Sequence, residues 1–465
     1  RRPTAKIESR SELSPAKGGI LSNIIDQYRS KHPRSEELAI EARTLFPDGV
    51  THDTRYVTPF GLTITHANGP RKWDIDGNEY IDYVMGHGAL LLGHAHPSIV
   101  SAVSKQVSQG THLGGNHLLE AEWAKLVIKL IPSAEKVRFT SSGTESTLLA
   151  ARLARAYTER STIIKFQEHF HGWNDYMMAG SGRGSGGIPE ATFGSMHILP
   201  PNDIQKVEDV LASSDDIAAI ILEPTGAHMG TLPIYPSFLK ELRELATKYN
   251  VVLIFDEVVT GFRVSPGGAQ ESFGVTPDLT TLAKILGGGL PGGAVAGKAD
   301  ILDMIAHQED PDWDDIRRVA HPGTFNANPV SAAAGIQALE LVAAGEANEQ
   351  ANQAAASIRR GINDLLARME IPGCAYGIAS FFHLQFGNPC VCPDRGICTR
   401  PHREISAGMT GAISTNLKRA MLNAGIDLMG GRMGIVSAVH TDMEVDQTIA
   451  AFEQGLDALR REGHI

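Results

Sequence analysis

The chain has 465 residues, of which 42% are hydrophobic and 20% are charged, a balance typical of a globular protein with a sizeable core. Its formal net charge of −11 argues against a general nucleic-acid-binding protein, because neutralising phosphates requires a basic surface. No apolar run reaches the roughly 18 residues of a membrane-spanning helix. We therefore expect a soluble protein with neither a nucleic-acid nor a membrane partner.

The N-terminus and one cysteine-containing segment carry the least regular sequence. The opening stretch, RRPTAKIESRSELSPAKGG, lacks the apolar segment of a secretory signal, so we expect a flexible lead-in and a cytoplasmic protein. Three of the four cysteines, Cys390, Cys392 and Cys398, fall in CVCPDRGIC, whose spacing matches neither a common zinc site nor a disulfide framework. A reduced loop is the simplest interpretation, with a metal site or a disulfide as the alternatives.

The middle of the chain alternates short apolar runs with longer helix-like stretches. The runs expected to be strands are KVRFT, STIIKF, IAAIILEP and VVLIFDEV, which begin at residues 136, 161, 217 and 251. Amphipathic stretches such as STLLAARLARAYTER and SFLKELRELATKYN lie between them. Apolar strands that alternate with helices predict a mostly parallel sheet covered by helices.

Composition divides the chain into three segments. Residues 96–330 hold the expected strands, and we assign them to a large α/β domain. After GTFNANP the sequence becomes alanine-rich and helical, so we assign residues 331–465 to a smaller α+β domain. Residues 1–95 are expected to pack with that smaller domain rather than with the central sheet.

The segment SSGTES follows the first expected strand and has the pattern of a helix start. Ser142 and Glu145 have the spacing of a capping box, and Gly143 allows the backbone to turn closely into the helix. The free N–H groups at the start of that helix, together with the hydroxyl of Thr144, would suit a phosphate. From this motif alone, a capped helix without a ligand is the simpler interpretation.

Further strand ends carry charged side chains, and ligands of open parallel sheets collect at such ends. IAAIILEP ends near Glu223, and Asp256 follows five consecutive apolar residues. A carboxylate in that setting stays charged only with a cationic or hydrogen-bonding partner. Lys284 lies among apolar residues and glycines in TTLAKILGGG, where desolvation favours the neutral, nucleophilic amine.

An anion site, a buried carboxylate and a nucleophilic lysine are together what pyridoxal phosphate requires. The helix start at Gly143 would hold the phosphate, Asp256 would pair with the ring nitrogen, and Lys284 would bind the aldehyde. We therefore predict pyridoxal 5'-phosphate as the cofactor.

Motifs along nearly the whole chain carry a family resemblance. They are WDIDGNEYIDYV, GHAHP, SSGTES, FHGWND, DEVVTGFR, LAKILGGGLPGG and GTFNANP. In this order and at this spacing they resemble the class III, fold-type I pyridoxal-phosphate aminotransferases, and most of all the glutamate-1-semialdehyde 2,1-aminomutases. The resemblance implies an enzyme with an α/β fold of type I, in which a large domain has a mostly parallel sheet between helices and a smaller α+β domain comes from both termini.

The resemblance also implies a role for each matching residue. Lys284 corresponds to the Schiff-base lysine, Asp256 to the partner of the pyridine nitrogen, and Glu223 to an acidic residue that orders the substrate side, so these three are expected to be catalytic. The residues expected to bind the cofactor are Ser142, Gly143, Thr144, Phe170, His171, Gly172, Asp256, Val258, Lys284 and Thr324. Phe170 stands where the family usually has tyrosine and would stack on the ring. Thr324 would reach the cofactor of a neighbouring subunit, which implies a homodimer with shared active sites.

Three residues are expected on the substrate side. Arg55 matches the arginine that holds the substrate carboxylate in the aminomutases, whereas Gly86-His87 replaces their Ser-Trp. Arg432 stands where we align their active-site glutamate, which reverses the charge unless the alignment is shifted and Arg432 lies on the surface. The differences favour a small anionic amine as the substrate, such as a dicarboxylate or a phosphonate.

We expect transfer of an amino group between an anionic amine or amino acid and a carbonyl compound, as in an aminotransferase or aminomutase. An ammonia lyase or epimerase acting on a dianionic amine is the alternative, because removing the proton next to the imine can also expel a leaving group or invert the centre. A cofactor-binding protein without activity is disfavoured, since every chemical position is filled.

Overall fold

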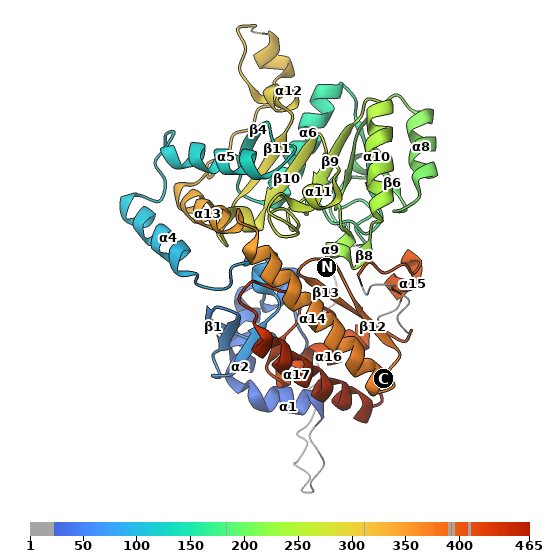
Figure 1. Cartoon of the computed structure of the whole chain (residues 1–465). Coiled ribbons are helices and arrows are strands. Elements are labelled where there is room, and N and C mark those ends of the chain that lie inside the picture. The colour runs from blue at the N-terminus through green and yellow to red at the C-terminus, as the bar shows by residue number, and fades with distance from the viewer. Residues whose placement is uncertain (1–22, 183, 311, 389–391, 393–395, 408–410) are drawn as a thin grey trace, which may run out of the picture.

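The computed structural model describes residues 23–182, 184–310, 312–388, 392, 396–407 and 411–465. The expected N-terminal lead-in and Cys390 fall outside these ranges. Within them, a large unit built on one sheet stands over a smaller unit to which both ends of the chain contribute (Figure 1). No helix in these ranges is long and apolar enough to cross a bilayer.

A seven-stranded sheet forms the centre of the large unit. Its strands, in spatial order, are β4 (Lys136–Thr140), β11 (Gly293–Gly297), β10 (Leu279–Ala283), β9 (Val252–Asp256), β7 (Ile217–Leu222), β5 (Thr162–Phe166) and β6 (Met196–Leu199). β11 runs antiparallel to both of its neighbours, and all pairs from β10 to β6 are parallel. The mostly parallel sheet predicted from the sequence is confirmed.

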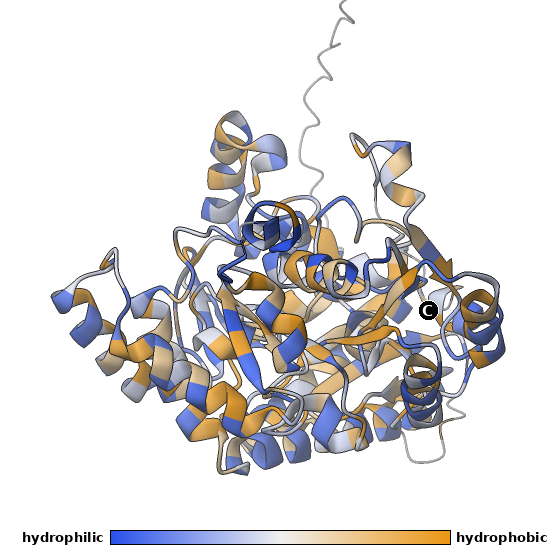
Figure 2. Cartoon of the chain, turned by 90° about the horizontal axis from the view of Figure 1, so that it is seen from above, coloured by the Kyte–Doolittle hydropathy of each residue, from blue (hydrophilic) through white to orange (hydrophobic). Residues whose placement is uncertain are grey.

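Alternating side chains allow each central strand to pack against helices on both faces of the sheet. In β7, Ala219 and Ile221 pack in the same core as α6 (Gly143–Thr158), whereas Ile220 packs on the other face with α10 (Pro236–Lys248). Seen from above, the strands are largely apolar and the outer helices carry the polar residues (Figure 2). The core therefore lies on both sides of the sheet, which leaves the strand ends as the place for polar chemistry.

The smaller unit joins the two ends of the described chain. One sheet has the order β1 (Ile64–Asn68), β2 (Arg71–Asp74), β3 (Glu79–Asp82), β14 (Ile426–Asp427), and another has the order β12 (Gly373–Tyr376), β13 (Phe381–Phe386), β15 (Met433–Ile435). β14 pairs in parallel with β3, where Ile426 stands opposite Ile81. The helices around these sheets are α1 (Ile24–Lys31), α2 (Pro33–Leu45), α14 (Glu346–Arg368), α16 (Gly411–Asn423) and α17 (Asp442–Arg461) (Figure 1).

The helical segment expected from residue 330 onward consists of two helices that join different cores. α13 (Pro329–Val342) packs against α4 (Pro97–Gln109) and α5 (Leu118–Leu130) of the large unit. α14 packs instead against α17 in the smaller unit. Helical periodicity does not reveal which core a helix joins, so the sequence could not separate these two helices, and the domain boundary at residue 331 stays a prediction.

Short elements connect these parts. They are η1 (Pro47–Gly49), η2 (Asp53–Arg55), α3 (Met85–Gly88), α7 (Glu190–Phe193), α9 (Ala227–Gly230), β8 (Leu232–Pro233), α11 (Gly268–Phe273), η3 (Lys284–Gly287), α12 (Ala299–Leu302), η4 (Asp303–Ile305), η5 (Trp313–Arg317) and α15 (His402–Ala407). Cys392 and Cys398 are buried free thiols, and Cys374 is disulfide-bonded. The described residues include no cluster of three or more metal-ligating side chains.

Gly335 is where α13 approaches the segment that follows β10. A Cβ at this position would lie 2.3 Å from the carbonyl oxygen of Leu286 and 2.5 Å from Nε1 of Trp123. Alanine favours a free helix over glycine by about 1 kcal/mol. We predict nevertheless that Gly335→Ala lowers the free energy of unfolding by about 1–3 kcal/mol, because the added methyl group overpacks this contact.

Urea unfolding measures this difference, with Gly455→Ala as the control. The Cβ added at Gly455 would come closest to Sδ of Met421, at 3.0 Å, and that flexible side chain can move away. An equal change in the two variants would contradict the prediction.

Candidate active site

A cavity of about 890 Å³ opens at the carboxyl ends of the central strands. Glu223 follows β7, Asp256 ends β9 and Lys284 follows β10, and all three line it. The smaller unit contributes His87 and Arg432 to the opposite side. The expected residues that line this cavity are Ser142, Gly143, Thr144, Phe170, His171, Gly172, Glu223, Asp256, Val258, Lys284, His87 and Arg432. Most of the residues expected from the sequence thus meet in one place.

The start of α6 forms one wall of the cavity. The Ser142 hydroxyl accepts a hydrogen bond from the N–H of Glu145 at 3.3 Å. The Glu145 carboxylate accepts the N–H of Ser141 at 2.6 Å, in place of the reciprocal bond to Ser142 expected for a capping box. Because this helix has 16 residues, its first N–H groups carry the positive end of a substantial dipole and suit an anion.

Two glycines allow close packing around this wall. A Cβ on Gly143 would lie 2.8 Å from Cγ1 of Val258, and one on Gly172 would lie 2.5 Å from Oγ1 of Thr144. Gly172 also has a left-handed backbone, with φ of +88°. A side chain at either glycine would push Val258 or Thr144 away from its place in the cavity wall.

Asp256 is a buried carboxylate fixed by several donors. Its Oδ1 accepts the N–H of Val258 and the hydroxyl of Thr281, both at 3.1 Å. Its Oδ2 lies 2.7 Å from Nδ1 of His171. Burial lowers the pKa of His171, although Asp256 opposes that shift. An oriented carboxylate in this setting is suited to hold a protonated ring nitrogen.

Lys284 presents its amine to the same cavity from the strand beside β9. Its backbone is left-handed, with φ of 52°, which turns the chain sharply after β10. Burial lowers the pKa of Lys284, against the opposing effect of the Asp256 and Glu223 carboxylates. A larger fraction of the amine is therefore neutral and nucleophilic than for an exposed lysine.

The Glu223 side chain accepts three backbone hydrogen bonds at the end of β7. The donors are the N–H groups of Phe170 at 2.9 Å and of His228 and Met229, each at 3.4 Å. Burial, reinforced by the charge of Asp256, raises the pKa of Glu223 to about 8 in spite of these donors. At neutral pH this side chain is therefore mostly a protonated acid. The bond to Phe170 also ties the half-buried aromatic residue to the strand end.

The side of the cavity that faces the strand ends contains a histidine pair and an arginine. The rings of His87 and His52 are stacked, with 5.1 Å between their centroids. Burial, followed by the charges of His52, Lys284 and Arg55, lowers the pKa of His87 to about 4, so its imidazole is neutral near pH 7. Arg432 is half-buried where it lines the cavity.

Two expected site residues do not line the cavity. Arg55 is exposed in η2, and its guanidinium donates to the Thr51 hydroxyl at 2.9 Å. Thr324 is exposed as well, and its carbonyl oxygen lies 2.7 Å from Nε2 of His112. The structure therefore does not bring Arg55 and Arg432 together in this cavity of the chain.

Several lining residues were missed by the sequence reasoning. His52 stacks on His87, and His228 and Met229 follow the Glu223 strand. These residues occupy irregular segments, which have no hydrophobic periodicity to place them. Their only signal was closeness in the sequence to expected site residues, since His52 lies three positions before Arg55 and His228 five positions after Glu223.

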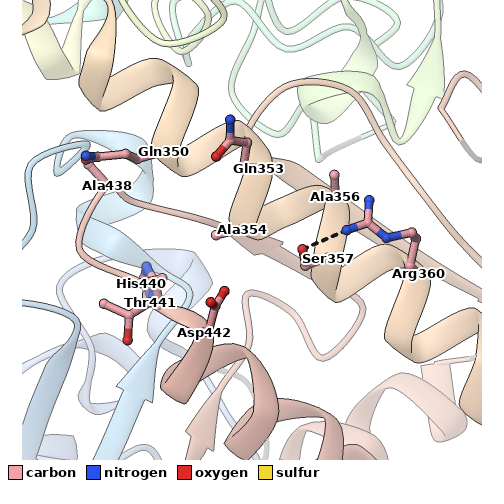
Figure 3. A pocket seen from close by; sticks show the side chains of 10 residues that line it. All are labelled: Gln350, Gln353, Ala354, Ala356, Ser357, Arg360, Ala438, His440, Thr441 and Asp442. Atoms are coloured by element: carbon pink, nitrogen blue, oxygen red, sulfur yellow. Dashed lines mark hydrogen bonds between the residues drawn. The ribbon is translucent and has the colours of Figure 1, made fainter.

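A second cavity of about 600 Å³ lies between α14 and the start of α17 (Figure 3). Arg360 lines it and donates to the Ser357 hydroxyl at 2.9 Å, while Thr441 and Asp442 contribute from the other side. Its described lining includes no lysine and no aromatic side chain other than His440. It therefore lacks the nucleophile and the flat apolar walls of the first cavity.

The first cavity fits pyridoxal phosphate on structural grounds. The start of α6 offers an anion cradle, the glycines leave its walls clear, and Asp256 and Lys284 stand at adjacent strand ends. Val258 and Phe170 add apolar surface for a flat ring. The donor set thus matches a ligand that has a phosphate, a basic ring nitrogen and an aldehyde.

We predict that Glu223 makes folding stability depend on pH. Its pKa of about 8 in the folded state exceeds the ordinary value of 4.5, so the folded chain binds this proton more tightly than the unfolded chain. Stability from this group is therefore complete below pH 4.5 and is lost as pH rises towards 8. The side chain introduced by Glu223→Gln stays neutral at every pH. The melting temperature of the variant minus that of the original protein should therefore be larger at pH 9 than at pH 6.

Calorimetry at the two pH values tests this prediction, with exposed Glu453 changed to Gln as the control. The control should give the same difference from the original protein at both pH values. A Glu223→Gln difference that does not change with pH would mean that Glu223 is ionised throughout.

Comparisons with known proteins agree with this geometry. The family model for class-III aminotransferases matches residues 52–377. Glutamate-1-semialdehyde 2,1-aminomutase 2 of Brevibacillus brevis is 37% identical over 437 residues, covering 91% of this chain and 98% of the relative.

Solved structures of similar proteins lead to the same family. An omega-transaminase from Sphaerobacter thermophilus has a TM-score of 0.83 and 32% identity, covering 92% of this chain and 98% of that chain. A beta-phenylalanine aminotransferase from Variovorax paradoxus has a TM-score of 0.82 and 30% identity, covering 94% and 97%. The resemblance and the cofactor predicted from the sequence are confirmed: the chain belongs to the class-III aminotransferase family, as a fold-type I enzyme that depends on pyridoxal 5'-phosphate.

Proposed function

We propose that this enzyme transfers an amino group between an anionic amine or amino acid and a carbonyl compound. The observation that carries the proposal is the content of one cavity, which combines Lys284 and Asp256 at the strand ends with Arg432 and His87 from the smaller unit. The first pair supports cofactor chemistry, and the second pair offers contacts for a substrate. We also propose a cytoplasmic location.

Each residue of the cofactor side would have a distinct task. When bound, pyridoxal phosphate supplies an aldehyde and an electron-withdrawing ring. Lys284 would hold the aldehyde and carry a proton to or from the substrate carbon. Asp256 would keep a proton on the ring nitrogen, and the start of α6 with Thr144 would bind the phosphate. Phe170 would supply an apolar face for the ring, without the hydroxyl usual in the family.

Arg432 is the feature that favours an anionic amine. The acidic side chains among the described lining residues, Glu223 and Asp256, lie at the strand ends that would serve the cofactor. A substrate carboxylate or phosphonate would therefore provide the counter-charge for Arg432, with neutral His87 as a hydrogen-bonding neighbour. A positive charge in place of the glutamate of the aminomutases favours transfer between two molecules over transfer within one.

The exposed position of Thr324 supports a homodimer with shared active sites. Thr324 is exposed and lies outside its own chain's cavity, next to Phe325, which is 59% exposed. Leu113 and Leu118, at the segment that packs near it, are 51% and 81% exposed. Apolar side chains gathered around Thr324 would be covered by a second copy, which would bring Thr324 to the partner's cofactor phosphate.

A screen of amines tests the proposed function. We expect dicarboxylic, phosphonic or β-amino acids to bleach the visible absorbance of the lysine-bound cofactor, and neutral monoamines to leave it. β-Amino acids belong in the screen because one structural relative is named a beta-phenylalanine aminotransferase. Arg432→Gln should lower kcat/KM for the anionic amine by the equivalent of roughly 2–5 kcal/mol, as expected when a buried charge pair is lost.

Two controls accompany the screen. Arg368→Gln removes an exposed arginine that pairs with Glu453, and it should leave the kinetics unchanged. Lys284→Ala should prevent borohydride from fixing the cofactor to the protein. The proposal is wrong if neutral monoamines react best and Arg432→Gln leaves their rates unchanged, or if borohydride still fixes the cofactor in the Lys284 variant.

We predict that the holoenzyme sediments as a dimer. We also predict that Thr324→Ala weakens cofactor binding but leaves the dimer intact. Loss of one hydrogen bond to a phosphate should raise the cofactor Kd by roughly 10- to 100-fold, since bonds to charged groups contribute about 1.5–3 kcal/mol. Thr247→Ala, which changes an exposed threonine on α10, is the matched control. An active monomer at micromolar concentration would rule out shared sites.

A further inference from the structure

A strained turn holds His87 in the cavity. Met85, Gly86, His87 and Gly88 all have left-handed backbones, with φ values of 44°, 60°, 56° and 95°. Glycine adopts this region without strain, whereas the side chains of Met85 and His87 make it unfavourable. Surrounding contacts must therefore hold this turn in place, and the residues that do so control the position of His87.

The entrance of the turn is held by Asp82, which is 2% exposed. Its Oδ1 accepts the N–H of Val84 at 2.9 Å, and its Oδ2 accepts the N–H of Met85 at 3.2 Å. Lys72 and His94 each lie 2.8 Å from the same carboxylate, and the Lys72 ammonium balances its charge. Asp82 thus ties the first residues of the turn to the end of β3.

The exit of the turn is held by Arg263, which is completely buried. Its guanidinium donates to the carbonyl oxygens of Gly88 and Val436, both at 2.9 Å, and to the Ser380 hydroxyl at 3.0 Å. All three acceptors are neutral, so no carboxylate among them compensates the cost of burying this charge. The contacts join the turn to the strands of the smaller unit that pack beside the cavity.

Gly88 links the turn to the lysine. A Cβ on Gly88 would lie 3.3 Å from Cγ1 of Val259 and 3.6 Å from Cδ of Lys284. A side chain at the end of the turn would therefore touch the Lys284 side chain, which lies close to this backbone. A shift of this backbone would change the distance between the His87 ring and the amine.

We propose that Asp82 and Arg263 are positioning residues that clamp the Met85–Gly88 turn at its two ends and thereby set the place of His87 over the substrate. The effect on substrate rests on the proposed function, whereas the clamp itself does not. Neither residue lines the cavity, so each acts through the turn. His87 is the contact by which they influence amine binding.

Asp82→Asn and Arg263→Lys test the clamp in the holoenzyme. Asparagine keeps the size of the side chain and lysine keeps the charge, but each removes part of the bonding to the turn. We expect amide hydrogen exchange in residues 84–89 to accelerate at least about tenfold through local opening. The KM for the reactive amine should rise by roughly 10- to 100-fold, the effect of misplacing a positioning group by about an ångström, with kcat nearly unchanged.

Arg359→Lys is the matched control. Arg359 donates to the carbonyl oxygen of Ala379 at 3.1 Å and to that of Phe381 at 2.6 Å. These residues lie on either side of Ser380, to which Arg263 donates, but neither belongs to the turn. This variant should change neither exchange at residues 84–89 nor KM. A double variant with His87→Ala should raise KM no further than His87→Ala alone, because the clamp acts through that ring.

The proposal is overturned if exchange at residues 84–89 is unchanged in both clamp variants, or if Arg359→Lys produces the same changes. Additive effects of His87→Ala and Asp82→Asn on KM would also overturn it. If Arg263→Lys does not fold, Asp82→Asn carries the test. If no amine reacts with the original holoenzyme, the proposed function fails, and the exchange measurement still decides whether the clamp exists.

Discussion

The pairing of β9 with β10 is the constraint on which the active site depends. In this parallel pair Asp256 stands opposite Thr281, whose hydroxyl donates to the Asp256 carboxylate at 3.1 Å. Lys284 follows at the end of β10, so one register places the carboxylate and the amine at neighbouring strand ends. A slip of one residue would turn the side chains of a strand to the opposite face. Apolar packing on both faces of the sheet prevents that slip, and the core thereby fixes the positions of Asp256 and Lys284 in the site.

Burial then gives the polar groups properties that they lack in water. Glu223 is held mostly as a neutral acid by its surroundings, and Lys284 is shifted towards the neutral amine. His87, in the wall that the smaller unit forms, is kept neutral. Glu223 and Lys284, whose pKa values are shifted towards neutral pH, can exchange protons there, which general acid and base catalysis requires. The same desolvation that costs folding stability at Glu223 therefore prepares the site for proton transfer.

Much of this arrangement could be predicted from the sequence because it follows regular elements. Asp256 and Glu223 end apolar runs, and parallel strands bring their carboxyl ends to one edge of a sheet. Gly143 and Thr144 begin a helix with a recognisable cap. Periodicity and capping therefore located the wall of the cavity that the strand ends and the start of α6 form.

The opposite side of the cavity could not be predicted in the same way. The turn from Met85 to Gly88 needs left-handed backbones at two residues that rarely adopt them, and only tertiary contacts explain it. His52 reaches the cavity from an irregular segment, whereas nearby Arg55 remains exposed. Tertiary packing also decided that α13 joins the large unit. These positions depend on contacts between distant parts of the chain, which no local pattern records.

Buried cations around the cavity indicate what its ligands must supply. Lys165 is fully buried and donates to the carbonyl oxygen of Met177 at 2.7 Å, and burial lowers its pKa to about 8. Arg263 is likewise buried among neutral acceptors, and burial lowers its pKa to about 9. For Lys165 desolvation outweighs the attraction of Glu223 and Asp256, and for Arg263 desolvation acts alone. A phosphate at α6 and an anionic substrate at Arg432 would add negative charge to this low-dielectric region. Ligand binding would therefore favour the charged form of these cations, so that the filled site is electrostatically more balanced than the protein alone.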